Sequence, residues 1–227
     1  MEKRTELILY TIIKEHIKTA LPVGSNVLVD KYKLDISPAT VRSEMANLEE
    51  AGFIIQPYTS AGRVPTEKAY EYYLKGLKEK KISDVEAKAI EDILKDIDEI
   101  SLKQMAKNLS QFSNQAVFWA FHRNNLYYTG VANLLSQPEF NQPEVIYDIS
   151  AIIDRVDEII DLIFDQVGFE PQVMIGSKNP FGSICSTILV KYKAKDTTGL
   201  FGILGPMRMN YEKNLNLIRF INNKLSK

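Results

Sequence analysis

Several residue types are scarce in this 227-residue chain, and each scarcity excludes a class of protein. The single cysteine, Cys185, cannot form an internal disulfide, so we expect a reducing compartment, the cytoplasm. The longest unbroken apolar runs are short segments such as Ala116–Phe121, far below the roughly 20 residues that cross a bilayer. The first residues lack the apolar core of a signal peptide, so we expect neither export nor a membrane anchor.

The chain also lacks an excess of charge of either sign. The chain has 28 Lys and Arg against 29 Asp and Glu, a formal net charge of −1, and no segment is strongly basic. A nucleic-acid-binding function must therefore rest on the geometry of a motif and not on bulk charge. Apolar residues at 45% and charged residues at 25% match an average soluble globular chain, which excludes fibrous and disordered classes.

The residues of enzyme and metal sites are also few. His16 and His122 have no Cys, His or acidic partner at metal-ligand spacing, and Cys185 lacks a nucleophile signature. The three glycines within residues 199–205 do not have dinucleotide-binding spacing and indicate a bulge or close packing in a strand. The carboxylates within residues 154–165 follow the polar side of a helix. We expect no enzyme activity, catalytic residue, metal or cofactor.

The first 80 residues have the pattern of a winged helix-turn-helix. Apolar residues at helical spacing predict a helix over Glu6–Thr19, and a short second helix begins near Ser25. Ser37 followed by Pro38 is a cap with proline at the first helical position, so a third helix begins there and ends at Glu50. A hairpin with a glycine-containing tip and a fourth helix follow. This order of elements is that of a winged helix-turn-helix domain.

Two further regions follow the winged helix. Residues 81–115 predict a long linker helix, from Ser83 to Phe112, whose isoleucines could pair in a coiled coil or pack on their own chain. Residues 116–227 mix predicted strands with helices over 145–167, broken near Ser150, and over 211–225, which indicates an α+β domain. The predicted strands are 117–121, 126–128, 172–175, 186–193 and 200–204.

The third helix carries the candidate DNA-binding residues. A recognition helix needs small or hydrogen-bonding side chains off its apolar face to read base edges in the major groove. Ala39 or the Thr40 methyl would touch a thymine methyl, Arg42 would read guanine or hold a phosphate, and Asn47 would serve adenine. The candidates on this helix are Ser37, Ala39, Thr40, Arg42, Ser43 and Asn47. The structural alternative is a winged helix used for protein contacts, with Ser37 only a cap.

Cations beside this helix are the other candidates. Arg63, next to the hairpin tip, would lie along the DNA backbone or in the minor groove. The phosphates of the DNA backbone on either side of the bound site would be held by Lys3, Arg4, Lys31 and Lys33.

Six groups of residues carry a resemblance to a known family. They are residues 22–25, Ser37-Pro38-Ala39-Thr40-Val41-Arg42 with Met45 and residues 48–50, residues 56–66 (Gln-Pro-Tyr-Thr-Ser-Ala-Gly-Arg-Val-Pro-Thr), residues 130–140, residues 175–176 with residues 179–180, and residues 205–209. The chain closely resembles the heat-inducible transcription repressor family HrcA. The resemblance implies a repressor of chaperone operons that binds double-stranded DNA at an inverted-repeat operator as a homodimer. It also implies a GAF-like second domain and modulation by the GroE chaperonin.

Carried over residue by residue, the resemblance makes residues 37–47 the recognition helix and Thr59, Ser60 and Arg63 part of the wing. Typical members are longer and carry an inserted dimerising segment where this chain has only His122–Thr129. This chain is therefore identified as a shortened member. An alternative function is a ligand-responsive winged-helix regulator whose GAF-like domain senses a small molecule.

Overall fold

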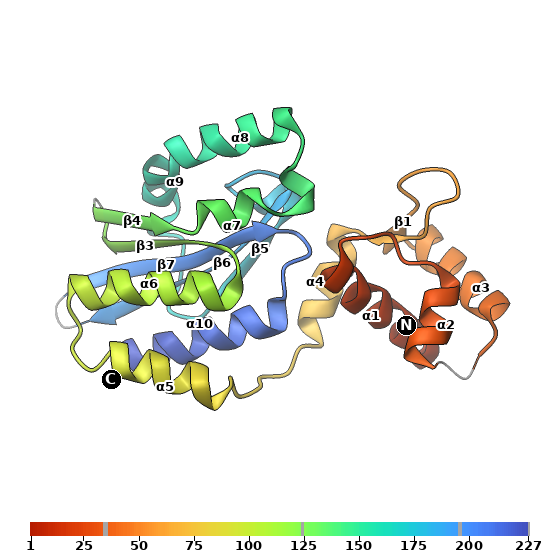
Figure 1. Ribbon diagram of the computed structural model, residues 1–227, viewed down its shortest axis with the longest axis horizontal. Coiled ribbons are helices and arrows are strands. Elements are labelled where there is room, and N and C mark those ends of the chain that lie inside the picture. The colour runs from red at the N-terminus through yellow and green to blue at the C-terminus, as the bar shows by residue number, and fades with distance from the viewer. Residues whose placement is uncertain (34–35, 124, 195–196, 227) are drawn as a thin grey trace. The chain divides into compact units, whose positions relative to one another are not determined.

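The computed structural model describes residues 1–33, 36–123, 125–194 and 197–226. Its residues divide into two compact units, Met1–Leu77 and Lys78–Lys227. The predicted α+β class is confirmed: helices predominate, and the second unit contains a five-stranded antiparallel sheet (Figure 1).

The first unit contains three helices, a short strand pair and a fourth helix. They are α1 (Lys3–Thr19), α2 (Ser25–Tyr32), α3 (Pro38–Glu50), β1 (Ile54–Ile55), β2 (Val64–Pro65) and α4 (Glu67–Lys75). The Ser37 hydroxyl accepts a hydrogen bond from the Thr40 amide and so begins α3, as the Ser-Pro signal predicts. Gly52, with φ of 75°, follows the end of α3 and adopts the left-handed conformation that glycine favours.

The core of the first unit lies along α1. Ile8, Leu9, Ile12 and Ile13 are fully buried on one face of this helix, at the spacing that the sequence predicts. Helices α2, α3 and α4 all contact α1. This order of elements is the one that the sequence predicts for a winged helix-turn-helix.

The second unit has a sheet with helices on both faces. Its strands are β3 (Ala116–His122), β4 (Asn125–Thr129), β5 (Gln172–Ile175), β6 (Cys185–Ala194) and β7 (Thr197–Pro206), in the order β4-β3-β7-β6-β5. All neighbouring strands are antiparallel. All five strands predicted from the sequence are confirmed. The edge strands are β4 and β5.

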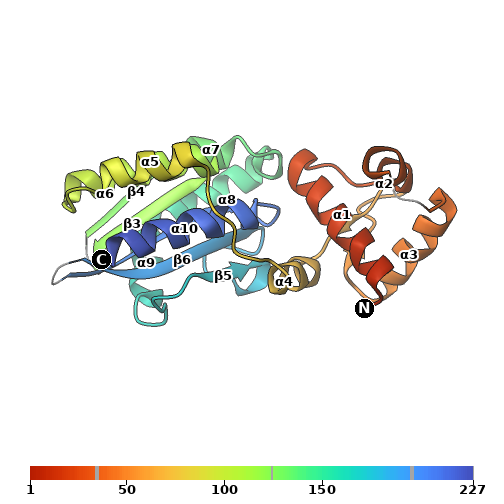
Figure 2. The ribbon, with the colours of Figure 1, turned by 90° about the horizontal axis from the view of Figure 1, so that it is seen from below.

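The helices of the second unit form two groups. The helices α5 (Asp84–Ile93), α6 (Glu99–Ser113) and α10 (Tyr211–Leu225) lie on one side of the sheet, and α10 runs along it (Figure 2). The other side bears α7 (Val131–Leu135), α8 (Pro143–Asp154) and α9 (Val156–Ile163) (Figure 1). Two 3₁₀ helices, Pro138–Phe140 and Gly176–Lys178, complete the unit. The closing helix begins and ends where the sequence predicts.

The prediction of one long linker helix over Ser83–Phe112 is wrong. The chain instead forms α5 and α6, because Asp98 accepts a hydrogen bond from the Ser101 amide at 2.8 Å and begins a new helix. The apolar side of α6 packs on β3 of its own chain, whereas Ile100 is 79% exposed. The isoleucines therefore do not form one continuous stripe.

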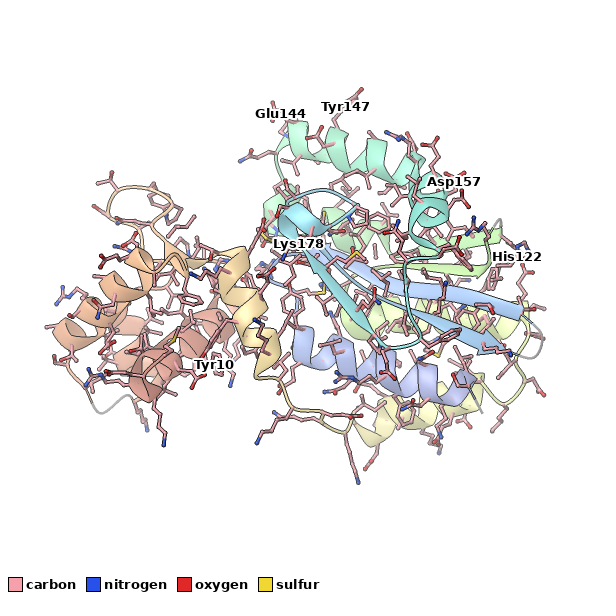
Figure 3. All side chains as sticks on the ribbon, turned by 180° about the vertical axis from the view of Figure 1, so that it is seen from behind. Tyr10, His122, Glu144, Tyr147, Asp157 and Lys178 are labelled. Carbon is pink, nitrogen blue, oxygen red and sulfur yellow. The ribbon has the colours of Figure 1, made fainter. Side chains whose placement is uncertain are left out.

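The helix predicted over 145–167 also breaks, but at Arg155 and not near Ser150. Helix α9 buries Val156, Ile160 and Ile163 in the core between the sheet and the helices. Helix α8 buries only Ile149 fully, and Tyr147 points away from the protein (Figure 3).

Three glycines of β7 allow close packing in the centre of the sheet. A Cβ at Gly199, Gly202 or Gly205 would lie between 2.2 and 2.5 Å from atoms of neighbouring residues, such as Tyr192 and Phe118. The interpretation of these glycines as packing positions, and not a phosphate loop, agrees with this geometry.

Candidate nucleic-acid interface

Helix α3 has one buried and one exposed face. Val41, Met45 and Leu48 are buried against the unit. The predicted recognition residues lie on the other side: Ala39, Arg42, Ser43 and Asn47 are exposed, and Thr40 is half-buried. The helix therefore presents to solvent the small and hydrogen-bonding side chains that can read base edges.

The predicted residues differ in how free their polar atoms are. The Ser37 hydroxyl accepts a hydrogen bond from the Thr40 amide at 3.1 Å and lies 2.9 Å from the Thr40 hydroxyl. Both hydroxyls are therefore engaged in capping the N-terminus of α3. Arg42 has no hydrogen-bond or ion-pair partner among the described residues. Its guanidinium is the single positive charge on α3.

The hairpin between β1 and β2, residues 56–63, is the segment that the sequence predicts to be the wing, and it is called the wing below. Thr59 and Ser60 are exposed at its tip, where Ser60 has a φ of 65° and the Ala61 amide donates to the Tyr58 carbonyl at 3.0 Å. The base of the wing is tied to the loop before α2. Val23 and Arg63 exchange two backbone hydrogen bonds, both of 2.9 Å.

Arg63 is not free in this structure. Its Nε donates to Oε2 of Glu49 at 2.9 Å, and its side chain is 22% exposed. Its partner Glu49 lies at the end of α3 and is not among the residues that the sequence pattern predicts for the site. A carboxylate near a helix C-terminus opposes the helix dipole, and this unfavourable position is the signal that could have identified it.

Two buried carboxylates hold the helices of the first unit together. Glu44 of α3 accepts from Arg4 Nε and Thr5 Oγ1 of α1, both at 2.8 Å. Glu15 of α1 accepts from Lys31 Nζ at 2.7 Å and from the Tyr32 hydroxyl at 2.8 Å. Arg4 and Lys31, two of the cations predicted to hold phosphates, are therefore already paired within the unit.

These partners keep both carboxyl groups ionised. Hydrogen bonds from Thr5 and Arg4 hold the pKa of Glu44 below its usual range, and Lys31 with Tyr32 does the same for the pKa of Glu15. The sequence signal is their spacing, because Glu44 stands three residues after Val41 and four before Leu48 on the buried face.

Acidification is expected to destabilise the first unit. A carboxyl whose pKa is lowered by folding contributes stability above its unfolded pKa, near 4.3, and loses that contribution as the pH falls through the folded value. Urea unfolding of the wild type, E15Q and E44Q between pH 7 and pH 3 measures this effect. The wild type should lose more stability than either variant. The exposed-site variant D154N should follow the wild type, and equal slopes in all four proteins would contradict the assignment.

The histidines and the cysteine occupy unremarkable surroundings. His16 Nδ1 lies 2.9 Å from the Leu21 carbonyl oxygen, and His122 lies at the exposed end of β3 (Figure 3). Cys185 is buried, and burial raises the pKa of its thiol to about 12. No group of three or more metal-ligating side chains occurs within residues 1–33, 36–123, 125–194 and 197–226.

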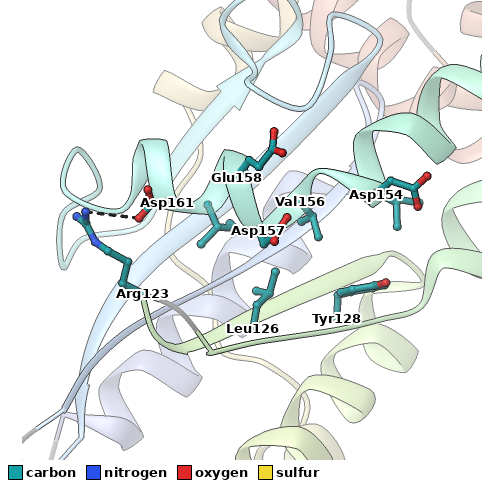
Figure 4. Close-up of a pocket in the computed structure, with 10 residues that line it drawn as sticks. Arg123, Leu126, Tyr128, Asp154, Val156, Asp157, Glu158 and Asp161 are labelled. Carbon is teal, nitrogen blue, oxygen red and sulfur yellow. Dashed lines mark ion pairs between the residues drawn. The ribbon is translucent and has the colours of Figure 1, made fainter.

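A groove of about 620 Å³ lies between β4 and the helices α8 and α9 (Figure 4). Leu126, Tyr128 and Ile153 are among its apolar lining residues. Its charged lining residues are Arg123, Asp154, Asp157, Glu158 and Asp161. Arg123 is engaged with Asp161 and Asp165. The one cation among these lining residues is therefore already paired with carboxylates, and the remaining charged lining residues are acidic.

Among the residues that the structure describes, none of the helices combines the length and the apolar character that a bilayer crossing requires.

The chain has two parts: a first unit with the element order that the sequence predicts for a winged helix-turn-helix, and a second unit built on an α+β sheet. The chain belongs to the HrcA family. The family described as "HrcA protein C terminal domain" matches residues 43–215.

Relatives from several bacteria are named "Heat-inducible transcription repressor HrcA". The protein of Desulforamulus reducens is 26% identical over 337 residues, covering 100% of this chain and 96% of that protein. The protein of Natranaerobius thermophilus is 26% identical over 329 residues, and the match covers 98% of this chain and 95% of that protein. The protein of Alkaliphilus metalliredigens is 45% identical over 118 residues, and this match covers 50% of this chain and 34% of that protein.

The comparisons also bear on fold and length. A solved structure described as "Crystal structure of a hypothetical protein at 2.2 A resolution" has a TM-score of 0.84 at 18% identity, covering 100% of this chain and 98% of that chain. It shares the fold. The match to the Desulforamulus protein extends over 337 residues and this chain has 227, so 110 positions have no counterpart here. The chain is a shortened member of the family.

Proposed function

We propose that this protein is a sequence-specific DNA-binding repressor of heat-shock (chaperone) genes. The observation that carries the proposal is the outer face of α3, where Ala39, Arg42, Ser43 and Asn47 are exposed and Arg42 has no partner among the described residues. Residues at the start of a recognition helix read base edges in the major groove. The names of the relatives support the same function.

The protein is proposed to bind its operator as a homodimer. One winged helix covers too few base pairs for strong specificity, whereas two recognition helices related by a two-fold axis read an inverted repeat in successive major grooves. Thr59 and Ser60 at the wing tip would contact the backbone beside each half-site. The family resemblance adds the GroE chaperonin as a partner that modulates the repressor.

A titration against duplex DNA tests the proposal. The protein is titrated against a duplex with the family's inverted repeat and against a scrambled duplex of equal length, at two salt concentrations, with its mass measured by light scattering. Tight, repeat-dependent binding by a dimer is expected, with an affinity that falls as salt rises. Equal, weak binding of a monomer to both duplexes would overturn the proposal.

The Arg42→Ala variant is expected to lose base reading. If the guanidinium bonds to guanine, the variant should lose about 1–3 kcal/mol of binding free energy and relax the preference at one base position. Affinities for operators substituted one base pair at a time measure this. Arg155→Ala, which removes the same charge from the second unit, is the matched control. A loss of the same size on operator and scrambled DNA would contradict base reading by Arg42.

A further inference from the structure

One carboxylate of α3 contacts both sides of the wing. Oε1 of Glu49 accepts the backbone N–H of Gln56 at 3.2 Å, and Oε2 accepts Arg63 Nε at 2.9 Å, with Arg63 Nη2 at 2.8 Å. Gln56 directly follows β1, and Arg63 directly precedes β2. Glu49 therefore bridges the two points at which the wing leaves its strand pair.

The strand pair alone cannot orient the wing firmly. Each strand has two residues, paired as Ile54 with Pro65 and Ile55 with Val64, and Pro65 has no N–H to donate. A two-stranded ribbon this short is marginal without additional contacts. The contact to Glu49 ties the wing directly to the recognition helix, whose direction the wing must match.

Electrostatics also favour a structural role for this ion pair. Glu49 is the second-last residue of α3, where the helix dipole disfavours a carboxylate, and α3 has no basic residue in its last turn. Arg63 supplies the missing positive charge from the wing. Its third nitrogen, Nη1, lies 3.4 Å from the Ala61 carbonyl oxygen, so all three nitrogens have partners within the unit.

We infer that Glu49 and Arg63 are positioning residues that fix the wing against the recognition helix. Arg63 then acts on DNA through the placement of Thr59 and Ser60, and not through its own contact with a phosphate. The inference rests on the proposed function for its DNA readout, and on the geometry of the first unit for its structural readout.

The DNA experiment uses Glu49→Ala, Arg63→Ala and the double variant of the full chain, with Glu50→Ala as matched control. Glu50 is an exposed neighbour that carries the same charge. Loss of a negative charge near DNA should by itself tighten binding. Glu49→Ala and Arg63→Ala should instead each weaken operator binding about threefold to tenfold, and the double variant should be no weaker than either single one. Glu50→Ala should not weaken binding.

The salt dependence separates positioning from phosphate contact. Arg63→Ala should keep the wild-type slope of log affinity against log salt, because no phosphate contact is lost. A direct contact would lower the slope by about 1, and Glu49→Ala would then tighten binding by freeing Arg63. Either of those two results would overturn the inference.

A measurement without DNA tests the same contact. Hydrogen exchange of the Gln56 amide should be at least threefold faster in Glu49→Ala and unchanged in Glu50→Ala, because only the first variant removes its acceptor. Glu49→Gln keeps an acceptor oxygen and should exchange at an intermediate rate. Unchanged exchange in all three variants would overturn the inference. If the wild type fails to prefer the inverted repeat but exchange responds as expected, the proposed function fails while the positioning contact stands.

Discussion

Gly62→Ala is expected to detach the wing and abolish specific DNA binding. A Cβ at residue 62 would lie 2.5 Å from the carbonyl carbon and oxygen of Val23 and 2.7 Å from its nitrogen. These are backbone atoms, so the clash cannot be relieved by rotating a side chain. The paired hydrogen bonds between Val23 and Arg63, next in sequence to Gly62, would have to lengthen. The expected cost is about 3 kcal/mol, at the upper end of what overpacking produces.

Two measurements on Gly62→Ala test this expectation. Urea unfolding should show destabilisation of the first unit, and a titration should show loss of preference for the inverted repeat over scrambled DNA. Gly24→Ala is the matched control, since a Cβ there meets nothing within 4 Å and its φ is −89°. That variant should lose less than about 1 kcal/mol, because alanine is only a poorer N-cap than glycine. Operator binding by Gly62→Ala at the wild-type level would show that the wing does not need this close approach.

Trp119→Ala should give the largest loss of stability, about 3–5 kcal/mol in the second unit. Trp119 is fully buried in β3, its ring stacks on Phe201 at 4.4 Å between centroids, and its Nε1 donates to the Tyr192 hydroxyl at 2.9 Å. Truncation would leave a cavity and deprive the buried Tyr192 hydroxyl of its donor.

Calorimetry and urea unfolding measure the effect of Trp119→Ala. Tyr147→Ala, at a side chain that is 76% exposed in the same unit, should change stability by less than about 0.5 kcal/mol. The loss of stability in Trp119→Phe should lie between those of Trp119→Ala and Tyr147→Ala, because phenylalanine keeps the stacking and loses the hydrogen bond. A loss below about 1 kcal/mol in Trp119→Ala would mean that the aromatic cluster of Trp119, Tyr192 and Phe201 is not central to the fold.

Local signals were enough to predict most of the fold. Ser37 and Pro38 mark the start of α3 because capping depends on neighbouring residues alone. Strands β6 and β7 follow from continuous apolar runs, because helices cover both faces of the sheet, and helix α10 follows from apolar residues at helical spacing. The exposed face of α3 follows from the same argument, since the residues off an apolar stripe must face solvent.

The rest depends on contacts between residues distant in sequence. The break before α6 does not show in the apolar pattern, which continues through it, although Asp98 and Ser101 form a capping box. The partners of Glu15, Glu44 and Glu49 lie on other elements, and spacing along one helix cannot identify them. The sequence position of Arg63 beside the wing tip predicts a DNA contact, whereas its ion pair with Glu49 is visible only in the folded chain.

Trp119 has a spectroscopic consequence. It is the only tryptophan of the chain and lies in the second unit, so the intrinsic tryptophan fluorescence follows the unfolding of that unit alone. The first unit, with its tyrosines and no tryptophan, is silent at excitation wavelengths selective for tryptophan. A melt followed by circular dichroism and by tryptophan emission would therefore separate the two units, and two non-coincident transitions would show that the first unit melts independently of the second.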